Sequence, residues 1–501
     1  MENVQTALER LRALASSGSV AKLAAAFEAG GHELALVGGP VRDAFLGRPI
    51  TDLDFTTDAR PERILELVKP IAEAHWDIGR EFGTIGARVD GEIVEITTYR
   101  ADEYDGVSRK PVVAFGDSIE GDLLRRDFTV NALALSLPGL RLVDPTGGME
   151  DLIAGLLRTP IDPAVSFGDD PLRMMRAVRF TSQLGFHLDA DAFSAVSDMA
   201  GRIADISTER VRDELVKLLS SDRPRMGLEL LVETGLAELV LPELPALRLE
   251  HDAAHRHKDV YEHSITVLEQ AIALEAERAP ESSPDLRLRA AALLHDIGKP
   301  KTRRFAPGGR VTFHGHDVVG AKLARKRLQA LRFDNDQIRS ISRLVELHMR
   351  VFNYEDAGWT DSAVRRFARD AGPELERLLI LIRSDITTQN RRKFDRLSFA
   401  IDDLERRIAE LREQEELGAV RPDLDGEEIM AILGIPPSRT VGEAYAFLLE
   451  MRLDEGPKPK EEARERLLAW WAAREGAAPD AEPADDQPAD AQPADDGPRD
   501  A

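Results

Sequence analysis

The stretch Gly38-Gly39-Pro40-Val41-Arg42-Asp43, followed seven residues later by Thr51-Asp52-Leu53-Asp54-Phe55, decides the fold of the first part of the chain. The preceding residues, 33–37, have the apolar pattern of a strand. Two glycines after a strand let an anion approach the backbone, and the helix that follows offers N–H donors. Arg42 can add a charge-assisted contact to a phosphate. This stretch therefore predicts a phosphate-binding loop.

Two aspartates follow the loop in a second predicted strand, 52–56. Because side chains two residues apart on a strand share a face, Asp52 and Asp54 point the same way. Crowded carboxylates repel one another unless a cation lies between them. Mg²⁺ favours carboxylates together with substrate phosphates, so the pair predicts metal-assisted nucleotidyl transfer. The alternative is a solvated acidic sheet edge.

The pattern of apolar residues changes near residue 150. Before it, strands are also predicted over 85–99, with a turn at 89–91, and over 132–137. After it, helical spacing recurs over 170–184, 208–219, 287–295, 318–331 and 399–416. The fold class is therefore predicted to be α+β, with a small mixed sheet in the head and an all-α neck and body behind it.

The net charge of −24 argues at first against a nucleic-acid partner. Residues 477–501, however, hold eight acidic residues against one arginine in a repeated Pro-Ala-Asp pattern. Such a segment cannot bury enough apolar surface to fold, so we expect a disordered acidic tail. Local basic clusters, at 299–304 and 391–393, leave room for an RNA partner.

Composition excludes several classes of protein. Cysteine is absent, which excludes disulfides, thiolate catalysis and Cys-containing zinc sites. No run of 18 apolar residues occurs, and the N-terminus lacks the pattern of a signal peptide. We therefore expect a cytoplasmic protein with no membrane partner.

Three further blocks follow in order: Arg125–Ala132 (RRDFTVNA), Asp144–Gly148 (DPTGG) and Asp169–Phe180 (DDPLRMMRAVRF). With the first two motifs, they resemble the class II CCA tRNA nucleotidyltransferases and bacterial poly(A) polymerases, in a form like the actinobacterial type. That family belongs to the DNA polymerase β superfamily. The resemblance spans roughly residues 30–230 and implies a polymerase-β-like nucleotidyltransferase head.

The resemblance implies roles for individual residues of the head. Asp52 and Asp54 would hold catalytic Mg²⁺, and Glu95 is where we expect a third carboxylate, with an exposed charge at the sheet rim as the alternative. The implied nucleotide-binding residues are Gly38, Gly39, Arg42, Arg126, Asp127, Asn131, Asp170, Arg173, Arg176 and Arg179.

Base selection can be reasoned from Asp170 and Arg173, which are three residues apart and so adjacent on one predicted helix face. Cytosine and adenine both present an amine donor beside a ring-nitrogen acceptor, whereas uracil and guanine present the reverse. A carboxylate only accepts and a guanidinium only donates, so the pair would accept C and A and reject U and G. The alternative is a surface salt bridge. Arg176 and Arg179 would contact phosphate or solvate the helix.

A histidine constellation marks the helical body. His263 lies on a predicted helix, His295-Asp296 ends another, and Asp385 follows downstream. These residues resemble the HD phosphohydrolase domain, with His316 and His348 as further metal ligands. Imidazole and carboxylate ligands without sulfur suit a divalent ion such as Mg²⁺, Mn²⁺ or Ni²⁺. The alternative is a set of hydrogen-bonded core histidines.

The function implied is template-independent addition of CCA to the 3′ end of tRNA from CTP and ATP, with pyrophosphate released. Open alternatives are a poly(A) polymerase, an A-adding or CC-adding enzyme, a phosphohydrolase working through the HD domain, and a non-catalytic RNA-binding protein. Residues 96–111 resemble the flexible loop of full CCA enzymes. The expected partners are tRNA, CTP and ATP, with no stable protein partner. The expected domains are a head (1–150), a helical neck (151–250), an HD domain (251–395), a helical C-terminal region (396–476) and the tail (477–501).

Overall fold

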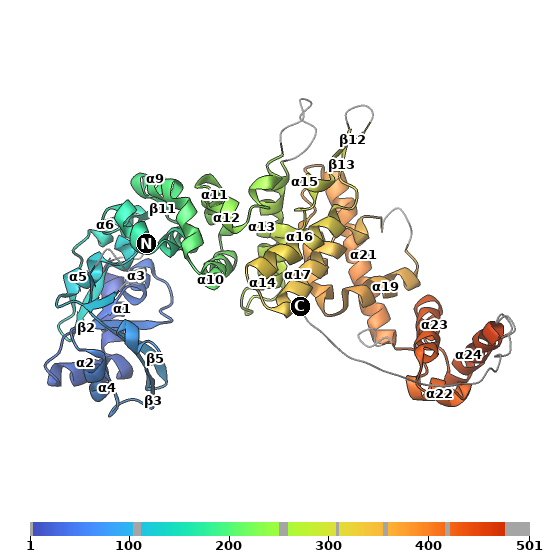
Figure 1. Cartoon of the computed structure of the whole chain (residues 1–501), viewed down its shortest axis with the longest axis horizontal. Helices are drawn as coiled ribbons and strands as arrows, with labels where there is room; N and C mark the ends of the chain where they lie inside the picture. The colour runs from blue at the N-terminus through green and yellow to red at the C-terminus, as the bar shows by residue number, and fades with distance from the viewer. Residues whose placement is uncertain are drawn as a thin grey trace, which may run out of the picture. The chain divides into compact units, whose positions relative to one another are not determined.

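The computed structural model describes residues 4–103, 112–249, 259–306, 310–353, 359–415 and 421–475 (Figure 1). The predicted disordered tail, and residues 104–111 of the predicted flexible loop, lie outside the described residues. The chain divides into two compact units, residues 1–352 with 373–399 and residues 353–372 with 400–501. Residues 359–372, which the predicted HD domain includes, therefore pack with the C-terminal unit.

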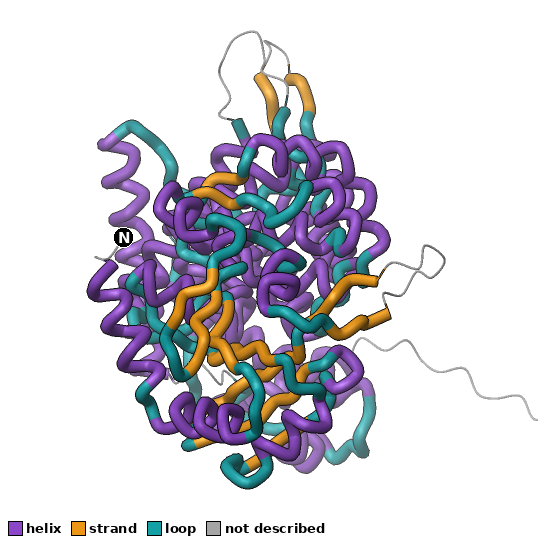
Figure 2. The backbone as a smooth tube through the Cα atoms, turned by 90° about the vertical axis from the view of Figure 1, so that its left-hand side faces the viewer, coloured by secondary structure: helices purple, strands orange, loops and turns teal. Residues whose placement is uncertain are grey.

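The head contains a seven-stranded sheet with the order β3-β4-β5-β2-β1-β8-β9. Figure 2 shows strands in orange. Among its described strands, β2 and β5 pair in parallel and the other neighbours are antiparallel, which confirms the predicted mixed sheet. A separate two-stranded ribbon, β6–β7, pairs antiparallel. The strands of the head are β1 (Leu34–Val37), β2 (Leu53–Thr57), β3 (Ala74–Trp76), β4 (Thr84–Val89), β5 (Glu92–Thr98), β6 (Arg100–Glu103), β7 (Val112–Phe115), β8 (Ala134–Leu137) and β9 (Arg141–Val143).

The two faces of this sheet have different surroundings. Leu53, Phe55 and Ile96 point to one face, where they share a buried core with apolar side chains of α1 to α4. Ala35 and Val37 point to the other face and pack against α5. The helices of the head are α1 (Val4–Ala15), α2 (Gly18–Ala29), α3 (Gly39–Leu46), α4 (Pro61–Val68), α5 (Ile119–Leu124) and α6 (Gly148–Ala154).

Short helices follow the head, and aspartates begin two of them. Asp162 and Asp189 accept hydrogen bonds from backbone N–H groups at the starts of α7 and α9. Helix α10 has the bounds that the apolar spacing predicts, whereas α8 ends at Phe180 and a wider helical turn continues to Gly185. The elements are β10 (Leu156–Leu157), α7 (Pro163–Asp169), α8 (Leu172–Phe180), β11 (His187–Leu188), α9 (Ala190–Met199), α10 (Thr208–Leu219), α11 (Pro224–Glu233) and α12 (Leu236–Val240).

The next helices hold the histidine constellation. Asp259, Asp285 and Asp334 cap three of them with their carboxylates. Arg289 on α14 is buried, and it bonds Glu275 and the carbonyls of residues 219 and 221, which ties this segment to α10. The elements are α13 (Val260–Arg278), α14 (Leu286–Leu294), α15 (Lys299–Thr302), β12 (Arg304–Ala306), β13 (Arg310–Thr312), α16 (His316–Ala330), α17 (Asn335–Leu347) and α20 (Leu375–Ser384).

The second unit has its own small core of apolar side chains, including Ile429, Leu448 and Leu467. Asp425 and Glu428 form a capping box at the start of α22. Its elements are α19 (Asp361–Ala371), the later part of α21 (Arg391–Glu415), α22 (Gly426–Leu433), α23 (Arg439–Glu455) and α24 (Lys460–Glu475). Within the described residues, no helix is long and apolar enough to cross a membrane.

Candidate functional site

Three carboxylates meet where β2 and β5 pair. Asp54 on β2 is the register partner of Glu95 on β5, while the flanking pairs Leu53–Val94 and Phe55–Ile96 are buried on the opposite face. Asp52 lies two residues before Asp54, just ahead of the strand, and is exposed. The alternation of strand side chains therefore points all three carboxylates to one face.

This crowding changes the acidity of Asp54. Burial raises the pKa of Asp54 to about 6, and the neighbouring negative charge of Glu95 adds to the rise. Asp52 raises the pKa further, while Arg126 opposes these effects. A divalent cation would relieve the same repulsion, because it interacts favourably with all the carboxylates at once. The donor set, carboxylate oxygens alone, fits Mg²⁺.

The glycine loop begins beside this carboxylate cluster. Leu36 on β1 pairs with Phe55 on β2, next to Asp54, and Gly38 follows two residues later. Gly38 has φ +73° and ψ −118°, a conformation that only glycine adopts readily, and it caps the start of α3. A Cβ at Gly38 would also lie 3.3 Å from Nη1 of Arg126. The loop thus keeps its backbone open toward Arg126, as an anion site requires.

A chain of hydrogen bonds links the glycine loop to α8. Arg42 donates from Nη1 to Oδ1 of Asn131 at 2.6 Å, and Asn131 donates to Asp127 at 3.0 Å. Asp127 accepts in turn from Nε of Arg176 at 2.7 Å. Burial alone would raise the pKa of Asp127, but Arg176 and these hydrogen bonds lower it to about 2. Arg42, Asp127 and Asn131 are buried, so they act chiefly on one another.

Arg126 has a different environment. It donates from Nη2 to Asp122 at 3.3 Å, and its side chain is 26% exposed, which leaves surface available to a ligand. Asp122 also accepts from Thr56 and from the backbone N–H of Arg100. Asp122 is not among the residues predicted from the sequence, because no motif distinguishes it from other acidic residues.

Asp170 and Arg173 are not arranged as the sequence predicted. Asp170 lies at the junction of α7 and α8 rather than on a helix face, because its backbone is extended there. Its carboxylate accepts from the N–H of Leu172 and pairs with Arg210. Arg173 donates to Ser166 and to the carbonyl of Arg125. Reading a base edge would therefore require exchange of some of these protein partners.

Arg179 occupies a structural position instead of a nucleotide pocket. It is 7% exposed, bonds Glu214 on α10 at 2.5 Å and lies over the ring of Phe180. Glu214 is buried as well. The helical spacing of Arg173, Arg176 and Arg179 suggested a row along one face, but Arg179 turns into the packing between α8 and α10. Its ion pair with Glu214 and its contact with Phe180 leave it little surface for a nucleotide contact.

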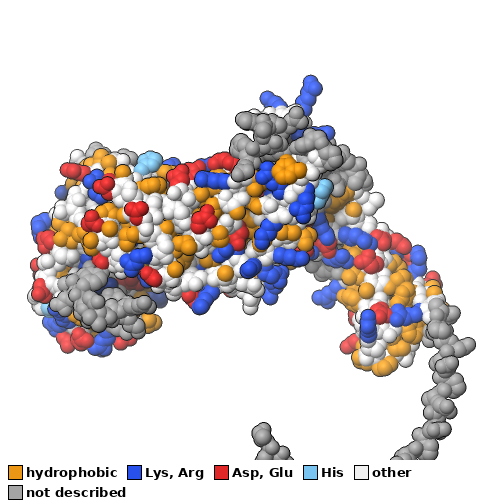
Figure 3. All heavy atoms as spheres, turned by 45° about the horizontal axis from the view of Figure 1, so that its top comes forward, with side chains coloured by type: hydrophobic (Ala, Val, Ile, Leu, Met, Phe, Trp, Pro, Cys, Tyr) orange, Lys and Arg blue, Asp and Glu red, His pale blue; other side chains and the backbone are white. Residues whose placement is uncertain are grey.

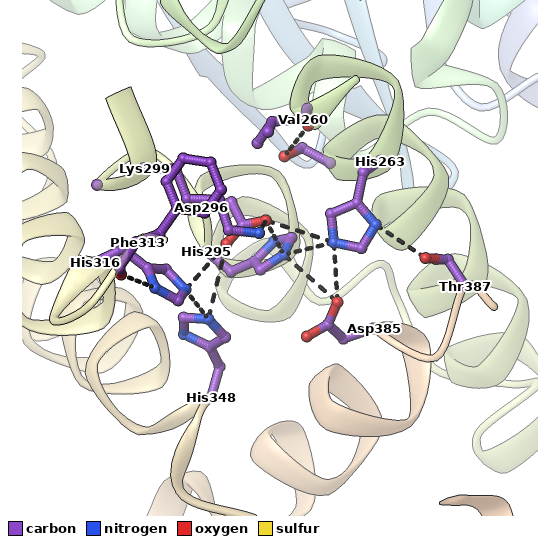
Figure 4. A network of polar contacts seen from close by, with 12 residues as sticks. Val260, His263, His295, Asp296, Lys299, Phe313, His316, His348, Asp385 and Thr387 are labelled. Carbon is purple, nitrogen blue, oxygen red and sulfur yellow. Dashed lines mark hydrogen bonds and ion pairs between the residues drawn. The ribbon is translucent and has the colours of Figure 1, made fainter. Parts of the chain in front are cut away.

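The histidine constellation converges as predicted (Figure 4). On one side, Nε2 of His263 lies 2.9 Å from Oδ1 of Asp385 and 3.3 Å from Nε2 of His295. On the other side, Nε2 of His316 lies 3.3 Å from Nε2 of His348. Asp296 lies between the two groups: its Oδ2 is 3.2 Å from His295, and its Oδ1 is 3.2 Å from His316.

The protonation of these imidazoles points to metal ions. Nδ1 of His295, His316 and His348 each lies within 2.9 Å of a backbone carbonyl three residues earlier, so each Nδ1 carries a proton. Their Nε2 lone pairs then converge without a proton to share. Carbonyl-bound Nδ1 with convergent Nε2 is the arrangement of histidine metal ligands. The two groups, His263–His295–Asp385 and Asp296–His316–His348, could each hold a divalent ion.

The electrostatics of the cluster agree with this interpretation. Burial lowers the pKa of His348 to about 4, with the neighbouring His295 contributing. Burial would lower the pKa of His295 too, but Asp296 outweighs it and raises the pKa. The carboxylates that stabilise a proton on His295 would equally stabilise a metal ion.

Local sequence explains how α16 reaches the cluster. A Cβ at Gly298 would lie 2.0 Å from the carbonyl oxygen of His316, so glycine permits the close approach of α16.

Lys299 is paired with Asp296 at 2.5 Å. Thr387, which the sequence analysis did not single out, lies 3.0 Å from Nδ1 of His263 and orients that ring.

Three protein-family models match the chain. Residues 34–158 match the poly A polymerase head domain, residues 185–247 match the probable RNA and SrmB-binding site of polymerase A, and residues 260–389 match the HD domain. The three matches follow the order of the head, the helices behind it and the histidine cluster.

Full-length similarities extend these matches. The chain is 36% identical to the A-adding tRNA nucleotidyltransferase of Deinococcus radiodurans, over 87% of this chain and 95% of that one. It is 34% identical to the CC-adding tRNA nucleotidyltransferase of Thermus thermophilus, over 88% of this chain and 94% of that one. Among solved structures, the Bacillus stearothermophilus CCA-adding enzyme in complex with CTP has a TM-score of 0.64 at 26% identity, covering 95% of this chain and 100% of that one.

Proposed function

This chain belongs to the family of tRNA nucleotidyltransferases that includes the CCA-adding enzymes, and from that premise we propose that it adds C, C and A in turn to the 3′ end of tRNA. The observation that carries the proposal is the pairing of Asp54 with Glu95 beside Asp52 and the glycine loop. Carboxylates next to a phosphate-binding loop supply what nucleotidyl transfer needs.

Asp52, Asp54 and Glu95 would hold Mg²⁺ in the head. When bound there, the metal stabilises negative charge on the reacting phosphate oxygens. The tRNA 3′-hydroxyl loses its proton to solvent, and its oxygen forms a bond to the α-phosphorus of CTP or ATP. The bond from that phosphorus to the bridging oxygen breaks, and pyrophosphate leaves with the electron pair.

The glycine loop would hold the triphosphate. Gly38 and Gly39 present open backbone, and the N-terminus of α3 favours an anion. Arg42 is fixed by Asp43 and Asn131, while Arg126 keeps an exposed surface nearby. This division suggests that Arg126 contacts the nucleotide directly and that Asn131 and Asp127 act by orienting Arg42.

Base selection would take place at the junction of α7 and α8. A carboxylate from Asp170 and a guanidinium from Arg173 match the donor and acceptor pattern shared by cytosine and adenine. Because Asp170 and Arg173 both have protein partners in this structure, we propose that the nucleotide displaces some of those partners. Incorporation of UTP or GTP by an Asp170→Asn variant would support this assignment.

An incorporation assay tests how much of CCA is added. The purified protein is given three tRNA primers, ending at the discriminator base, after the first C and after the second C, each with CTP, ATP or both. Full addition extends all three to CCA. An A-adding enzyme extends only the primer ending in CC, a CC-adding enzyme stops before A, and a poly(A) polymerase makes long A tails.

The HD segment favours a second activity, hydrolysis of a phosphate ester. The convergence of four histidines and two aspartates into two neighbouring ligand groups is the observation that supports it. A pair of divalent ions can stabilise both the attacking and the leaving oxygen of a phosphate ester. Release of phosphate from a phosphomonoester, lost in His295→Ala but kept in Asp54→Asn, tests this activity separately.

Basic residues in the helical body would bind the tRNA backbone. Lys301, Arg304 and the cluster at 391–393 are exposed, and Figure 3 shows Lys and Arg side chains gathered over this part of the chain. Binding through phosphates releases counterions, so tRNA affinity should fall steeply with salt. Affinity that is insensitive to salt would contradict this part of the proposal.

A further inference from the structure

A row of four register partners crosses the sheet of the head. Trp76 on β3 pairs with Gly86 on β4, Gly86 pairs with Glu95 on β5, and Glu95 pairs with Asp54 on β2. Directly paired residues point to the same face of a sheet. The indole of Trp76 therefore lies on the face that carries the catalytic carboxylates.

Gly86 shows which way the indole points. A Cβ at Gly86 would lie 1.9 Å from Nε1 and 2.2 Å from Cε2 of Trp76. The ring thus lies directly over the backbone of β4 at Gly86, the register partner of Glu95. Glycine inside a strand weakens the strand, and it is found where another group approaches the backbone closely. Here that group is the indole.

The indole remains accessible. Trp76 is only half-buried, and Ala74 and His75 on the same edge strand are exposed. Arg88 and Ile93, which belong to the same face further along β4 and β5, are exposed as well. Within the part of the chain that the structure describes, Trp76 Nε1 makes no hydrogen bond. A flat aromatic surface is therefore open to a ligand on this face.

The strand order separates two sides of the carboxylate cluster. The glycine loop follows β1, on one side of β2, whereas Trp76 lies on the other side, beyond β5 and β4. At about 4.8 Å between strands, Trp76 lies ~10 Å from Glu95 and ~14 Å from Asp54 along the row. Phosphoryl transfer needs the attacking and leaving oxygens roughly in line, on opposite sides of the reacting phosphorus. The side away from the triphosphate loop is where the attacking hydroxyl must come from.

We infer that Trp76 is a primer-contacting residue: its indole stacks on the 3′-terminal base of the RNA and directs the 3′-hydroxyl toward Asp54 and Glu95. The inference rests on the proposed function. Stacking on an aromatic ring tolerates any base, because every base has a π face. That tolerance suits a site whose terminal base changes after each addition, whereas the choice of C or A is made elsewhere.

The experiment measures addition of a single C to a tRNA ending at its discriminator base. KM for the primer and KM for CTP are determined separately for wild type, Trp76→Ala, Trp76→Phe and Gly86→Ala. We expect Trp76→Ala to raise the KM for the primer about tenfold, in line with the loss of one stacked base, and to leave the KM for CTP unchanged. Trp76→Phe keeps an aromatic ring, so its KM for the primer should rise less than that of Trp76→Ala.

Gly86→Ala displaces the ring without removing it, so it should show the same selective rise in the KM for the primer. Trp471→Ala, a change of another half-buried tryptophan in the second unit, is the matched control and should leave both constants unchanged. A spectroscopic readout does not depend on turnover: primer should quench tryptophan fluorescence in wild type more than in Trp76→Phe, and thermal unfolding shows that both variants fold.

Unchanged KM for the primer in Trp76→Ala, a rise confined to CTP, or equal quenching in wild type and Trp76→Phe would each overturn the inference. These results differ from failure of the proposed function, in which the wild-type protein itself incorporates no nucleotide into tRNA.

Discussion

Asp54 and Glu95 are direct partners across the one parallel strand pair described in the sheet of the head. The pairing places two carboxylates on one face while their neighbours Leu53, Phe55, Val94 and Ile96 fill the core on the other. Burial and the charge of Glu95 together raise the pKa of Asp54 to about 6. With all its carboxylates ionised, the site is therefore electrostatically unfavourable, and a metal ion can stabilise it.

Magnesium dependence should change with pH because a proton on Asp54 competes with the metal. Below pH 6 the proton must leave before Mg²⁺ binds, so the Mg²⁺ concentration for half-maximal incorporation should rise about tenfold for each further pH unit. Titrations of Mg²⁺ at pH 5, 6, 7 and 8 measure this. Glu95→Gln removes a charge that raises the pKa of Asp54. In this variant, the rise in the Mg²⁺ requirement should begin at a lower pH. A requirement that stays constant across this range would contradict the assignment.

The same pKa predicts how Asp54 affects stability without metal. A carboxyl whose folded pKa is raised contributes stability that is fully present below its unfolded pKa, near 3.8, and is lost as pH rises through about 6. Ionised Asp54 should thus destabilise the metal-free protein at pH 8. Asp54→Asn should raise the melting temperature in EDTA at pH 8, and raise it less at pH 5. An equal change in melting temperature at pH 5 and pH 8 would count against the raised pKa of Asp54.

Asn131 should act through its neighbours. Asn131→Ala removes one buried hydrogen bond from Arg42 and one from Asp127, which should cost about 1–3 kcal/mol of stability. Because Arg42 loses its orientation, KM for CTP and for ATP should rise together. Urea unfolding and steady-state kinetics measure the two effects. Exposed Ser194→Ala serves as a control, and an Asn131→Ala protein with normal KM values would refute the orienting role.

Arg179 should behave as a structural residue. Arg179→Met leaves Glu214 buried without its partner and should cost about 3–5 kcal/mol in urea unfolding. Replacing Glu214 by Leu in the same protein should restore most of that stability. KM for CTP should stay close to the wild-type value in the double variant. A large rise in that KM would instead support the direct nucleotide contact that the sequence predicted.

The HD cluster should bind two metal ions per chain. With Asp52→Asn and Asp54→Asn removing the site in the head, we expect two Mn²⁺ ions by equilibrium binding and metal analysis. His348→Gln should reduce the number to one, since it removes a ligand from a single group. His314→Gln changes an exposed histidine outside both groups and should keep two. Full occupancy in His348→Gln would contradict the second site.

Much of the head could be predicted because its chemistry lies in short local motifs. The Gly38–Asp43 stretch and the Asp52–Asp54 pair depend only on spacing along one strand and one turn, and the structure has both where expected. The histidine ligands were also recognisable, because the His295-Asp296 doublet ends an apolar stretch, with His263 upstream and Asp385 downstream, and resembles the HD domain.

Other features depend on the packing of distant segments, which sequence patterns do not contain. Periodicity placed Arg179 on a helix face but gave no sign that Glu214, 35 residues later, would bury it. Asp170 was predicted inside a helix, although the proline that follows it favours an extended conformation there. The position of Trp76 over Gly86 follows from strand register, and the only local sign was a glycine inside an apolar strand.

Incorporation into defined tRNA ends is the most direct test of the account. A tRNA ending at its discriminator base is incubated with CTP, ATP and Mg²⁺, and the product ends are sequenced. We predict that wild-type protein adds CCA and stops, and that Asp54→Asn adds nothing while still binding the tRNA. Products that end in A alone or CC alone, or activity that survives in Asp54→Asn, would contradict it.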